Sequence, residues 1–433
     1  MTVDPVSDAY WDEATYEAEA HRVFEICHGC RLCVTICPSF PALMDLTDGV
    51  DGEVGKLSAR DWTRVIDLCY QCKLCYVRCP YTPPHEWQVD FPRLMMRGQA
   101  IEARRRGIRL PDRIMSNTDL MGRMGGLTAP LANLANRMPP ARFMMERTLG
   151  VHRQRLLPRF HIQTFASWFR GRKQGQTTAQ RKVALFYTCY VNYNDPQVGK
   201  ACVEVLERSG VAVSCPEQQC CGMPFLDSGD VPAAQEKARF NLRSLLKAVE
   251  EGCDVVVPGP TCGYTLKQEY PRLLGPEAEP LAFHTFDMCE YLMRLHGQGA
   301  LNTDFGSSPG KIVYHLPCHL KAQNIGYKSR DLMQLIPGAS VEVVDRCSGH
   351  DGTWSVKKEY FELSLKVGRR LFEDIREAQP ALAASDCPLA GIQIEQATGV
   401  RPVHPVQVLQ AAYSPACLPD RRAGRAGKPE KSE

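Results

Sequence analysis

The clearest pattern of hydrophobic and polar positions lies between residues 179 and 415, where short apolar runs alternate with amphipathic stretches and the whole pattern occurs twice. Residues 182–189 (KVALFYTC) match residues 311–318 (KIVYHLPC): each segment has a basic residue, an apolar run and then a cysteine. Such a run predicts a buried strand that ends at the cysteine.

Each copy continues with one amphipathic helix and a second apolar run. The apolar side chains on one helix face are Ala238, Leu242, Leu245, Leu246 and Val249 in the first copy, and Tyr360, Leu363, Val367, Leu371 and Ile375 in the second. Residues 254–258 (DVVVP) predict a strand, and residues 380–387 (PALAASDC) predict its weaker counterpart. Alternating strands and helices with short connections predict two tandem α/β domains with parallel strands, at residues 179–300 and 301–415.

The cysteines divide the rest of the chain. Of the 20 cysteines, eight lie within residues 1–100, none within 101–178, and one, Cys417, in the polar tail at 416–433, which we expect to be disordered. The predicted fold class is multidomain α+β: a helical, dicluster ferredoxin-type domain at 1–100, a basic Met- and Arg-rich helical connector at 101–178, and the two cysteine-rich α/β domains.

So many cysteines suit a secreted disulfide scaffold, a zinc protein or an iron–sulfur protein. Residues 1–25 carry seven acidic residues and one arginine, and so do not form a signal peptide. No apolar stretch approaches the ~20 residues of a membrane-spanning helix. We therefore expect a cytoplasmic protein, in which clustered thiols bind metal or carry out redox chemistry.

Two runs near the N-terminus repeat the bacterial ferredoxin spacing C-x2-C-x2-C-x3-C-P. The runs are Cys27, Cys30, Cys33, Cys37 and Cys69, Cys72, Cys75, Cys79. The fourth cysteine of such a run binds the other cluster, so the predicted ligand sets are crossed. One [4Fe–4S] cluster takes Cys27, Cys30, Cys33 and Cys79, and the second takes Cys69, Cys72, Cys75 and Cys37. Two zinc ribbons would leave the third cysteine and the proline of each run unexplained.

A different motif occurs in the first α/β repeat. Cys220-Cys221-Gly222, together with Cys189 and Cys262, predicts one metal site with four thiols. Burial as a small hydrophobic side chain suits Cys202, Cys253 and Cys289 instead.

The second repeat keeps Cys318, Cys347 and Cys387 but has Ser348 in place of the second adjacent cysteine. We predict a second metal site there. Three nearby histidines, His315, His319 and His350, could replace a thiolate on iron or could form hydrogen bonds within the loops, and both alternatives stay open.

The net charge of +3 conceals a basic belt between residues 93 and 182, with 19 Lys and Arg against four acidic residues. The near-equal totals of 52 Lys and Arg and 49 Asp and Glu in the whole chain exclude a polycation built for nucleic acid. The belt is predicted to bind an anionic membrane surface, to dock a redox partner, or to be a solvated helical linker. The apolar residues expected to insert into a membrane are Met144, Met145, Leu149, Phe165, Trp168 and Phe169.

These motifs, with the strings SNTDLMG at 116–122, CYVNYNDPQ at 189–197 and YHLPCH at 314–319, resemble the family of the C subunit of anaerobic glycerol-3-phosphate dehydrogenase. More broadly, the chain resembles iron–sulfur proteins related to the D subunit of heterodisulfide reductase. The resemblance covers roughly residues 22 to 412. It implies that each cysteine-rich repeat carries a lone Cys, Cys-Cys-Gly and Cys-x-x-Cys, which together bind a non-cubane iron–sulfur cluster.

The chain departs from that ligand pattern at Thr265, Ser348 and Ala390, so four of five ligands remain in the first repeat and three of five in the second. The resemblance implies an iron–sulfur subunit of an oxidoreductase. It would relay electrons from a flavin-containing dehydrogenase of the glycerol-3-phosphate type through two [4Fe–4S] clusters, and then the site at Cys189, to quinone or another acceptor. Whether the first cysteine-rich domain binds a further iron–sulfur cluster stays open.

Other partners and another activity compete with this interpretation. The chain could instead be the electron-transfer partner of another redox protein, of the glycolate or lactate oxidase type or a rubrerythrin, or it could be a thiol or disulfide reductase that uses the cysteine-rich site. We find no flavin or nicotinamide glycine fingerprint, so the chain is not expected to act alone on an organic substrate, and no catalytic residue is assigned. The expected location is the cytoplasm, with peripheral binding to the cytoplasmic face of the inner membrane as an alternative.

Overall fold

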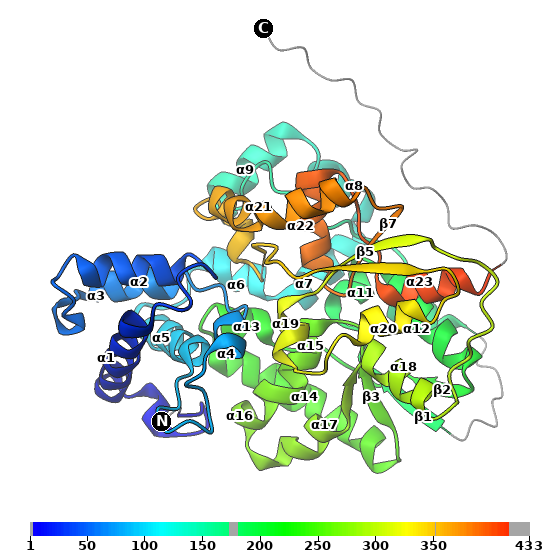
Figure 1. The fold of residues 1–433 in the computed structure, drawn as a ribbon, viewed down its shortest axis with the longest axis horizontal. Helices are drawn as coiled ribbons and strands as arrows, with labels where there is room; N and C mark the ends of the chain where they lie inside the picture. The colour runs from blue at the N-terminus through cyan, green and yellow to red at the C-terminus, as the bar shows by residue number, and fades with distance from the viewer. Residues whose placement is uncertain (1–2, 173–180, 351, 415–433) are drawn as a thin grey trace, which may run out of the picture.

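A computed structural model describes residues 3–172, 181–350 and 352–414, and these combine many helices with two small parallel sheets (Figure 1). The predicted fold class is confirmed: a helical N-terminal part precedes two α/β repeats. The tail at 416–433, including Cys417, lies outside the described residues. No helix in the described ranges is long and apolar enough to cross a membrane.

The N-terminal helices pack around an aromatic and aliphatic core. Asp12 caps the first helix by accepting the Thr15 N–H at 2.7 Å, and the rings of Phe40 and Phe91 stack with their centroids 4.4 Å apart. This core fixes the loops that carry the eight ferredoxin-type cysteines. The helices are α1 (Glu13–Cys30), α2 (Ser39–Asp48), α3 (Ala59–Asp67), α4 (Leu74–Arg78) and α5 (Phe91–Arg106).

The basic belt is helical and is partly internal. Arg142, only 4% exposed, donates to the carbonyls of His152, Arg153 and Arg155, which fastens the segment after α9. The belt therefore contains structural arginines as well as solvated ones. After α5, its helices are α6 (Leu110–Ser116), α7 (Thr118–Leu127), α8 (Ala129–Ala135), α9 (Pro139–Leu149) and α10 (Phe165–Gly171).

The prediction that Phe165 and Phe169 insert into a membrane is wrong. The helix α10 buries both rings, which are 0% and 6% exposed, in the core beside the first sheet, and Trp168 packs against the same core. Met144 is 56% exposed, as the prediction requires.

The first repeat forms a four-stranded parallel sheet in the order β2-β1-β3-β4. Its strands are β1 (Arg181–Leu185), β2 (Val211–Ser214), β3 (Asp254–Val257) and β4 (Thr285–Asp287). Its helices are α11 (Cys189–Tyr193), α12 (Pro196–Arg208), α13 (Met223–Asp227), α14 (Val231–Glu250), α15 (Pro260–Tyr264), α16 (Tyr270–Leu274), α17 (Glu279–Phe283) and α18 (Met288–Gly297).

The second repeat forms a three-stranded parallel sheet in the order β6-β5-β7. Its strands are β5 (Lys311–His315), β6 (Ser340–Val344) and β7 (Leu382–Ser385), and its helices are α19 (Cys318–Ala322), α20 (Lys328–Gln334), α21 (Phe361–Ala378), α22 (Pro388–Thr398) and α23 (Pro405–Ala412). One hydrophobic core spans both repeats, since Leu185 of β1, Tyr314 of β5 and Leu409 of α23 belong to it.

The N-terminal helices contact both repeats. Glu269 of the first repeat is buried and lies 3.0 Å from Arg93 and 3.9 Å from Lys73. On the second repeat, the Trp354 ring lies 4.8 Å from that of Tyr70, between centroids, and its indole N–H donates to the Asp67 carbonyl at 2.9 Å. The loop after α3 is therefore held directly against the second repeat.

Candidate metal centres

The structure brings together the thiols that the crossed ligand assignment pairs. The strongest electrostatic neighbours of Cys27 are Cys33, Cys79 and Cys30, and burial together with these neighbours raises the pKa of the Cys27 thiol. Burial, followed by Cys79 and Cys30, raises the pKa of Cys33 to about 11. A bound cation reverses this unfavourable ionisation, because a metal-bound thiol is deprotonated.

The remaining four ferredoxin-type cysteines form a second group. Cys37 faces Cys69, and both are neighbours of the buried Cys75. Cys72 is buried too, but the thiols that interact most strongly with its charge are Cys347 and Cys318 of the second repeat, ahead of Cys37 and Cys75. This group therefore lies directly against the second cysteine-rich site.

The first cysteine-rich site consists of a chain of four thiols. Cys189 and Cys221 both form hydrogen bonds to Cys220, and Cys221 also contacts Cys262. The pKa of Cys220 is lowered by the S–H donors of Cys189 and Cys221, while the pKa of each donor thiol is raised. Gly222 has φ = +96°, and a Cβ there would lie 3.1 Å from the Ala234 carbonyl oxygen, so the loop requires glycine at that position.

The start of α7, in the basic belt, covers this site. The Thr118 hydroxyl faces the thiols of Cys189 and Cys220 and has no other hydrogen-bond partner in the described chain. Asp119 accepts the Cys220 N–H at 3.0 and 3.1 Å and pairs with Lys237 at 3.0 Å. The sequence did not predict that Thr118 and Asp119 contact this site. The string SNTDLMG at 116–122, which contains both residues, was the only sign that the segment matters.

The second cysteine-rich site gathers Cys318 at the start of α19, Cys347 after β6 and Cys387 before α22, and all three line one small cavity. Ser348 and Ala390 line it at the positions where the family pattern has cysteine. Gly349 has φ = +70°, and a Cβ there would lie 2.1 Å from the Ser364 carbonyl oxygen. This loop thus keeps the glycine requirement of the first repeat although it lacks the second adjacent cysteine.

The structure distinguishes the three histidines, for which the sequence left open whether each binds metal or forms hydrogen bonds. The ring nitrogens of His315 face the Ser385 hydroxyl at 3.0 Å and the Arg346 carbonyl at 3.2 Å. Those of His319 face the Thr261 hydroxyl at 2.8 Å and the Gln71 carbonyl at 3.0 Å. These two rings form hydrogen bonds within loops, and burial lowers the pKa of each to about 4.

His350 differs from the other two histidines. It is 5% exposed, lines the same cavity as Cys318, Cys347 and Cys387, and its Nδ1 has no hydrogen-bond partner within the described residues. Burial lowers the pKa of His350, which favours the neutral imidazole.

Ligand spacing distinguishes a single metal ion from a cluster. Four sulfurs around one zinc lie about 3.8 Å apart, given a Zn–S bond of about 2.3 Å. One group in the described ranges has three potential ligand atoms all within 4.8 Å of one another, and it contains none of the predicted ligand cysteines. Among the described residues, no three of the predicted ligand cysteines have their sulfurs all within 4.8 Å of one another.

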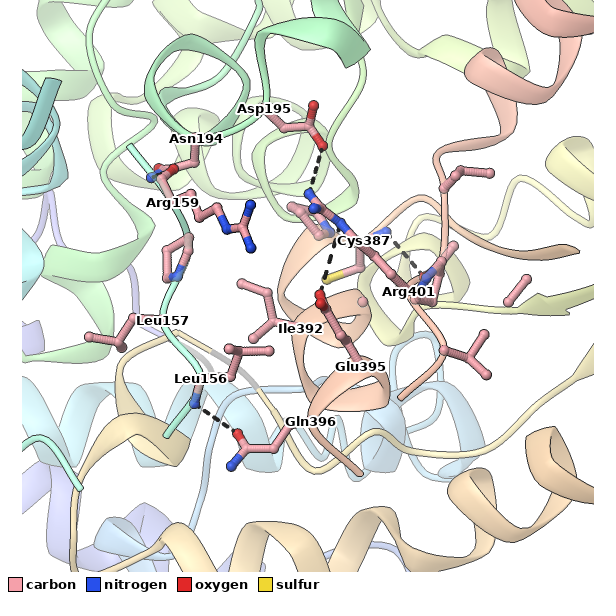
Figure 2. A pocket seen from close by; sticks show the side chains of 18 of the residues that line it. Leu156, Leu157, Arg159, Asn194, Asp195, Cys387, Ile392, Glu395, Gln396 and Arg401 are labelled. Carbon is pink, nitrogen blue, oxygen red and sulfur yellow. Dashed lines mark hydrogen bonds and ion pairs between the residues drawn. The ribbon is translucent and has the colours of Figure 1, made fainter. Parts of the chain in front are cut away.

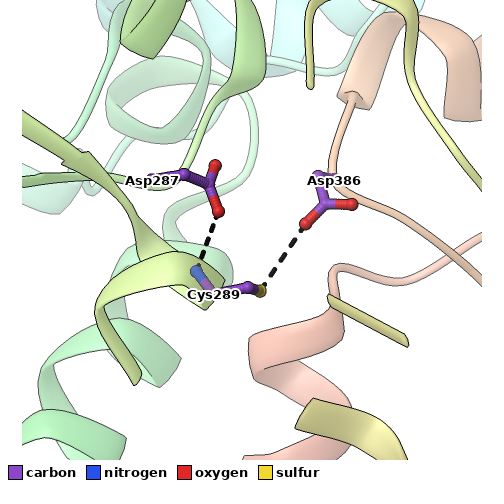
Figure 3. A group of neighbouring side chains, drawn as sticks. All are labelled: Asp287, Cys289 and Asp386. Atoms are coloured by element: carbon purple, nitrogen blue, oxygen red, sulfur yellow. Dashed lines mark hydrogen bonds between the residues drawn. The ribbon is translucent and has the colours of Figure 1, made fainter. Parts of the chain in front are cut away.

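The exceptional group is Asp287, Cys289 and Asp386 (Figure 3). Asp386 accepts hydrogen bonds from the hydroxyls of Tyr314 at 2.6 Å and Ser329 at 2.7 Å, and from the Cys289 thiol at 3.6 Å. Because the Asp386 carboxylate already accepts three hydrogen bonds, we interpret these three residues as a buried junction between the repeats and not as a metal site. Burial, then the charge of Asp386, raises the pKa of Asp287 to about 8.

A large open cavity, about 2340 Å³ in volume, reaches the second site at Cys387 (Figure 2). Its walls come from the basic belt, from the loop around Thr188 and from α22. Arg401 crosses it between Asp195 at 3.6 Å and Glu395 at 3.9 Å.

Comparisons with known proteins agree with this architecture. The sequence profile described as a cysteine-rich domain matches residues 183–267 and 312–395. The profile described as the citrate utilization protein B Fer4-like domain matches residues 20–105.

Two relatives illustrate the range of similarity. The chain is 33% identical over 401 residues to the C subunit of the anaerobic glycerol-3-phosphate dehydrogenase of Escherichia coli (strain K12), covering 90% of this chain and 99% of that protein. It is 35% identical over 222 residues to lactate utilization protein A of Geobacillus thermodenitrificans (strain NG80-2), covering 48% of this chain and 87% of that protein. The chain is an iron–sulfur redox protein that belongs to the family of the C subunit of anaerobic glycerol-3-phosphate dehydrogenase.

Proposed function

We propose that this chain relays single electrons from a flavin-containing dehydrogenase to quinone or another acceptor. Iron–sulfur clusters suit this task because they accept one electron at a time, whereas a reduced flavin holds two. The two [4Fe–4S] clusters would be bound crosswise, one by Cys27, Cys30, Cys33 and Cys79 and the other by Cys37, Cys69, Cys72 and Cys75.

One observation carries this proposal: Cys72 of the second ferredoxin-type run has Cys347 and Cys318 as its strongest thiol neighbours. Tyr70 reinforces the contact, because its hydroxyl lies 3.2 Å from the Cys347 sulfur. Electrons would therefore pass from the second [4Fe–4S] cluster to the second cysteine-rich site before the first one. The first site, at Cys189, Cys220, Cys221 and Cys262, would hold a further cluster, under Thr118.

The relatives suggest the donor. Similarity along nearly the whole chain to the C subunit of a glycerol-3-phosphate dehydrogenase favours a dehydrogenase of that type, and a lactate-oxidising partner is the alternative. A disulfide reductase acting at the first site is less well supported, because Cys220 and Cys221 are 1% and 3% exposed and out of reach of a substrate.

The basic belt supports peripheral binding to an anionic membrane. Large apolar side chains are exposed along α7, α8 and α9: Leu120, Met124, Leu127, Leu131, Leu134, Met138, Phe143 and Met144. Leu127 and Leu131 are 87% and 71% exposed, and arginines flank them in sequence. Vesicles of phosphatidylglycerol should float the wild type but not a Leu127→Glu/Leu131→Glu variant, and equal flotation of both would contradict this surface.

The relay itself is tested with anaerobically purified protein. A Cys79→Ser variant should lose one of two [4Fe–4S] EPR signals and the iron that belongs to it. Cys202→Ser, which changes a buried cysteine outside all four sites, should keep both signals. The wild type should then be reduced by a substrate-reduced flavin dehydrogenase and reoxidised by a soluble quinone. Failure of every tested glycerol-3-phosphate and lactate dehydrogenase to reduce it would contradict the proposed donors.

A further inference from the structure

The second cysteine-rich site has lost two of the five cysteines of the family pattern, yet three features of its surroundings indicate that it is built to hold an anionic metal centre. The first is the cavity itself. Cys318 at the start of α19, Cys347 after β6 and Cys387 before α22 line it together, and Gly349, at φ = +70°, has a backbone conformation that a residue with a Cβ would not adopt there. A site released from metal binding would not require that loop geometry.

The second feature is His350. Its Nδ1 is buried and has no hydrogen-bond partner among residues 3–172, 181–350 and 352–414, and an unpaired polar atom inside a protein costs about 1–3 kcal/mol. Neutral imidazole nitrogen is a common ligand of iron and zinc, and histidine replaces cysteine at one iron of some iron–sulfur centres. His350 lies two residues after Ser348, the position of the missing cysteine, so it can supply a ligand from the same loop.

The third feature is Arg155, from the basic belt. Its guanidinium is 2% exposed, and no carboxylate of the described chain lies within ion-pair distance. It donates instead to neutral oxygens: Ser355 O at 2.6 Å, Ser364 Oγ at 2.8 Å, Gln396 Oε1 at 3.1 Å and Gln393 Oε1. A buried charge is normally paired, and an isolated one costs several kcal/mol.

Arg155 lies beside the second site. Its charge acts on His350, and it donates to Ser364, whose carbonyl closes over Gly349. The glutamines that it binds belong to α22, which begins directly after Cys387. Three thiolates at the cavity would supply the negative charge that Arg155 lacks.

We propose that the second cysteine-rich site holds an iron–sulfur cluster through Cys318, Cys347, Cys387 and Nδ1 of His350, with Arg155 as its buried counter-charge. This inference rests on the chain being an iron–sulfur protein but not on the identity of its donor or acceptor.

The ligand assignment is tested by spectroscopy on the full chain, purified anaerobically. Pulsed EPR of the wild type should detect strong ¹⁴N coupling to one cluster. His350→Cys should abolish this coupling while retaining the iron. His350→Ala should lose the iron and sulfide of that cluster and leave the two ferredoxin-type EPR signals unchanged. His315→Gln is the matched control, since its ring nitrogens are already hydrogen-bonded, and it should keep the coupling.

Absence of strong ¹⁴N coupling in the wild type would overturn the assignment of His350, and this measurement needs no variant to fold. Equal iron and sulfide in the wild type and in a Cys318→Ser/Cys387→Ser variant would overturn the cluster. Neither outcome depends on electron transfer, so the failure of this inference and the failure of the relay are distinguishable.

The counter-charge is tested by redox titration of the same cluster. Arg155→Gln should lower its reduction potential, because removing a nearby positive charge disfavours the reduced state, and Arg155→Lys should keep the potential close to that of the wild type. Arg97→Gln is the control, as another buried belt arginine, which donates to the carbonyls of Ala9, Tyr10 and Asp12 and to the Thr15 hydroxyl. An unchanged potential in Arg155→Gln would refute the role of Arg155.

Discussion

Asp119 connects the basic belt to the first cysteine-rich site, and its replacement by asparagine measures how much this connection contributes to the free energy of unfolding. The carboxylate accepts the Cys220 N–H and pairs with Lys237, and the side chains of the pair are 11% and 17% exposed. Asparagine keeps an oxygen for the N–H but leaves the ammonium of Lys237 without this carboxylate, while Gln219 Oε1, at 2.7 Å, still accepts from it. A hydrogen bond to a charged group contributes about 1.5–3 kcal/mol, and leaving a buried charge unpaired adds to the loss. We expect Asp119→Asn to lower the unfolding free energy by about 2–3 kcal/mol.

The assay is anaerobic thermal unfolding, with iron retention at the first site measured in parallel. An unfolding entropy of about 2.1 cal/mol/K per residue over 433 residues gives about 1 °C per kcal/mol, so the midpoint should fall by about 2–3 °C. Lys237→Met should also destabilise the protein, whereas the double variant should be more stable than the sum of the two single effects predicts, by at least about 1 kcal/mol. Strict additivity of the two substitutions would refute the argument that the pair acts as a unit.

Two further substitutions test the packing around the sites. Gly122→Ala places a Cβ 2.1 Å from the ring of Tyr193, at the end of the helix that begins at Cys189, so it should lower the free energy of unfolding by about 1–3 kcal/mol. Gly126→Ala is the control, because a Cβ there meets only a carbonyl oxygen at 3.4 Å. Equal unfolding midpoints for the two variants would contradict this expectation. Asp287 titrates near 3.8 when unfolded and near pH 8 when folded, so only the folded state holds its proton between these values and stability falls as pH rises from about 4 to 8. Asp287→Asn should remove that slope and raise the unfolding midpoint at pH 8, and an unchanged slope would count against the buried carboxyl.

The sequence predicts most of the fold because the hydrophobic periodicity is local. The strands at β1, β3, β5 and β7 and the long helices α14 and α21 form where the apolar pattern places them. The cysteine runs likewise predict which thiols gather, since ferredoxin spacing already implies the crossed sets. The crossed sets join cysteines at most 52 residues apart, from Cys27 to Cys79.

The remaining features depend on contacts between distant segments. Thr118 and Asp119 lie about 100 residues before Cys220, and no periodicity links them. The same limit explains the misassigned rings of Phe165 and Phe169: an aromatic residue in a basic, apolar stretch suits a membrane as well as a core. The choice among the three histidines required the hydrogen-bond partners of each ring, which the sequence does not contain.

Tyr70 joins the second ferredoxin-type run to the second cysteine-rich site, and its hydroxyl provides a test of that junction. The ring is 5% exposed and packs against the Trp354 ring at an interplanar angle of 38°, so Tyr70→Phe removes the hydroxyl with little loss of packing. Once Cys347 is a metal-bound thiolate, the hydroxyl 3.2 Å away is the donor, and hydrogen bonds to cluster sulfurs raise the reduction potential. A bond of about 1 kcal/mol that strengthens by half on reduction corresponds to about 20 mV, given about 59 mV per tenfold change for one electron. Redox titration should therefore give a potential about 20 mV lower for the second-site cluster in Tyr70→Phe, with the cluster of Cys27, Cys30, Cys33 and Cys79 unchanged. A shift confined to that distant cluster, or none at either, would show that the Tyr70–Cys347 contact does not join the two sites electronically.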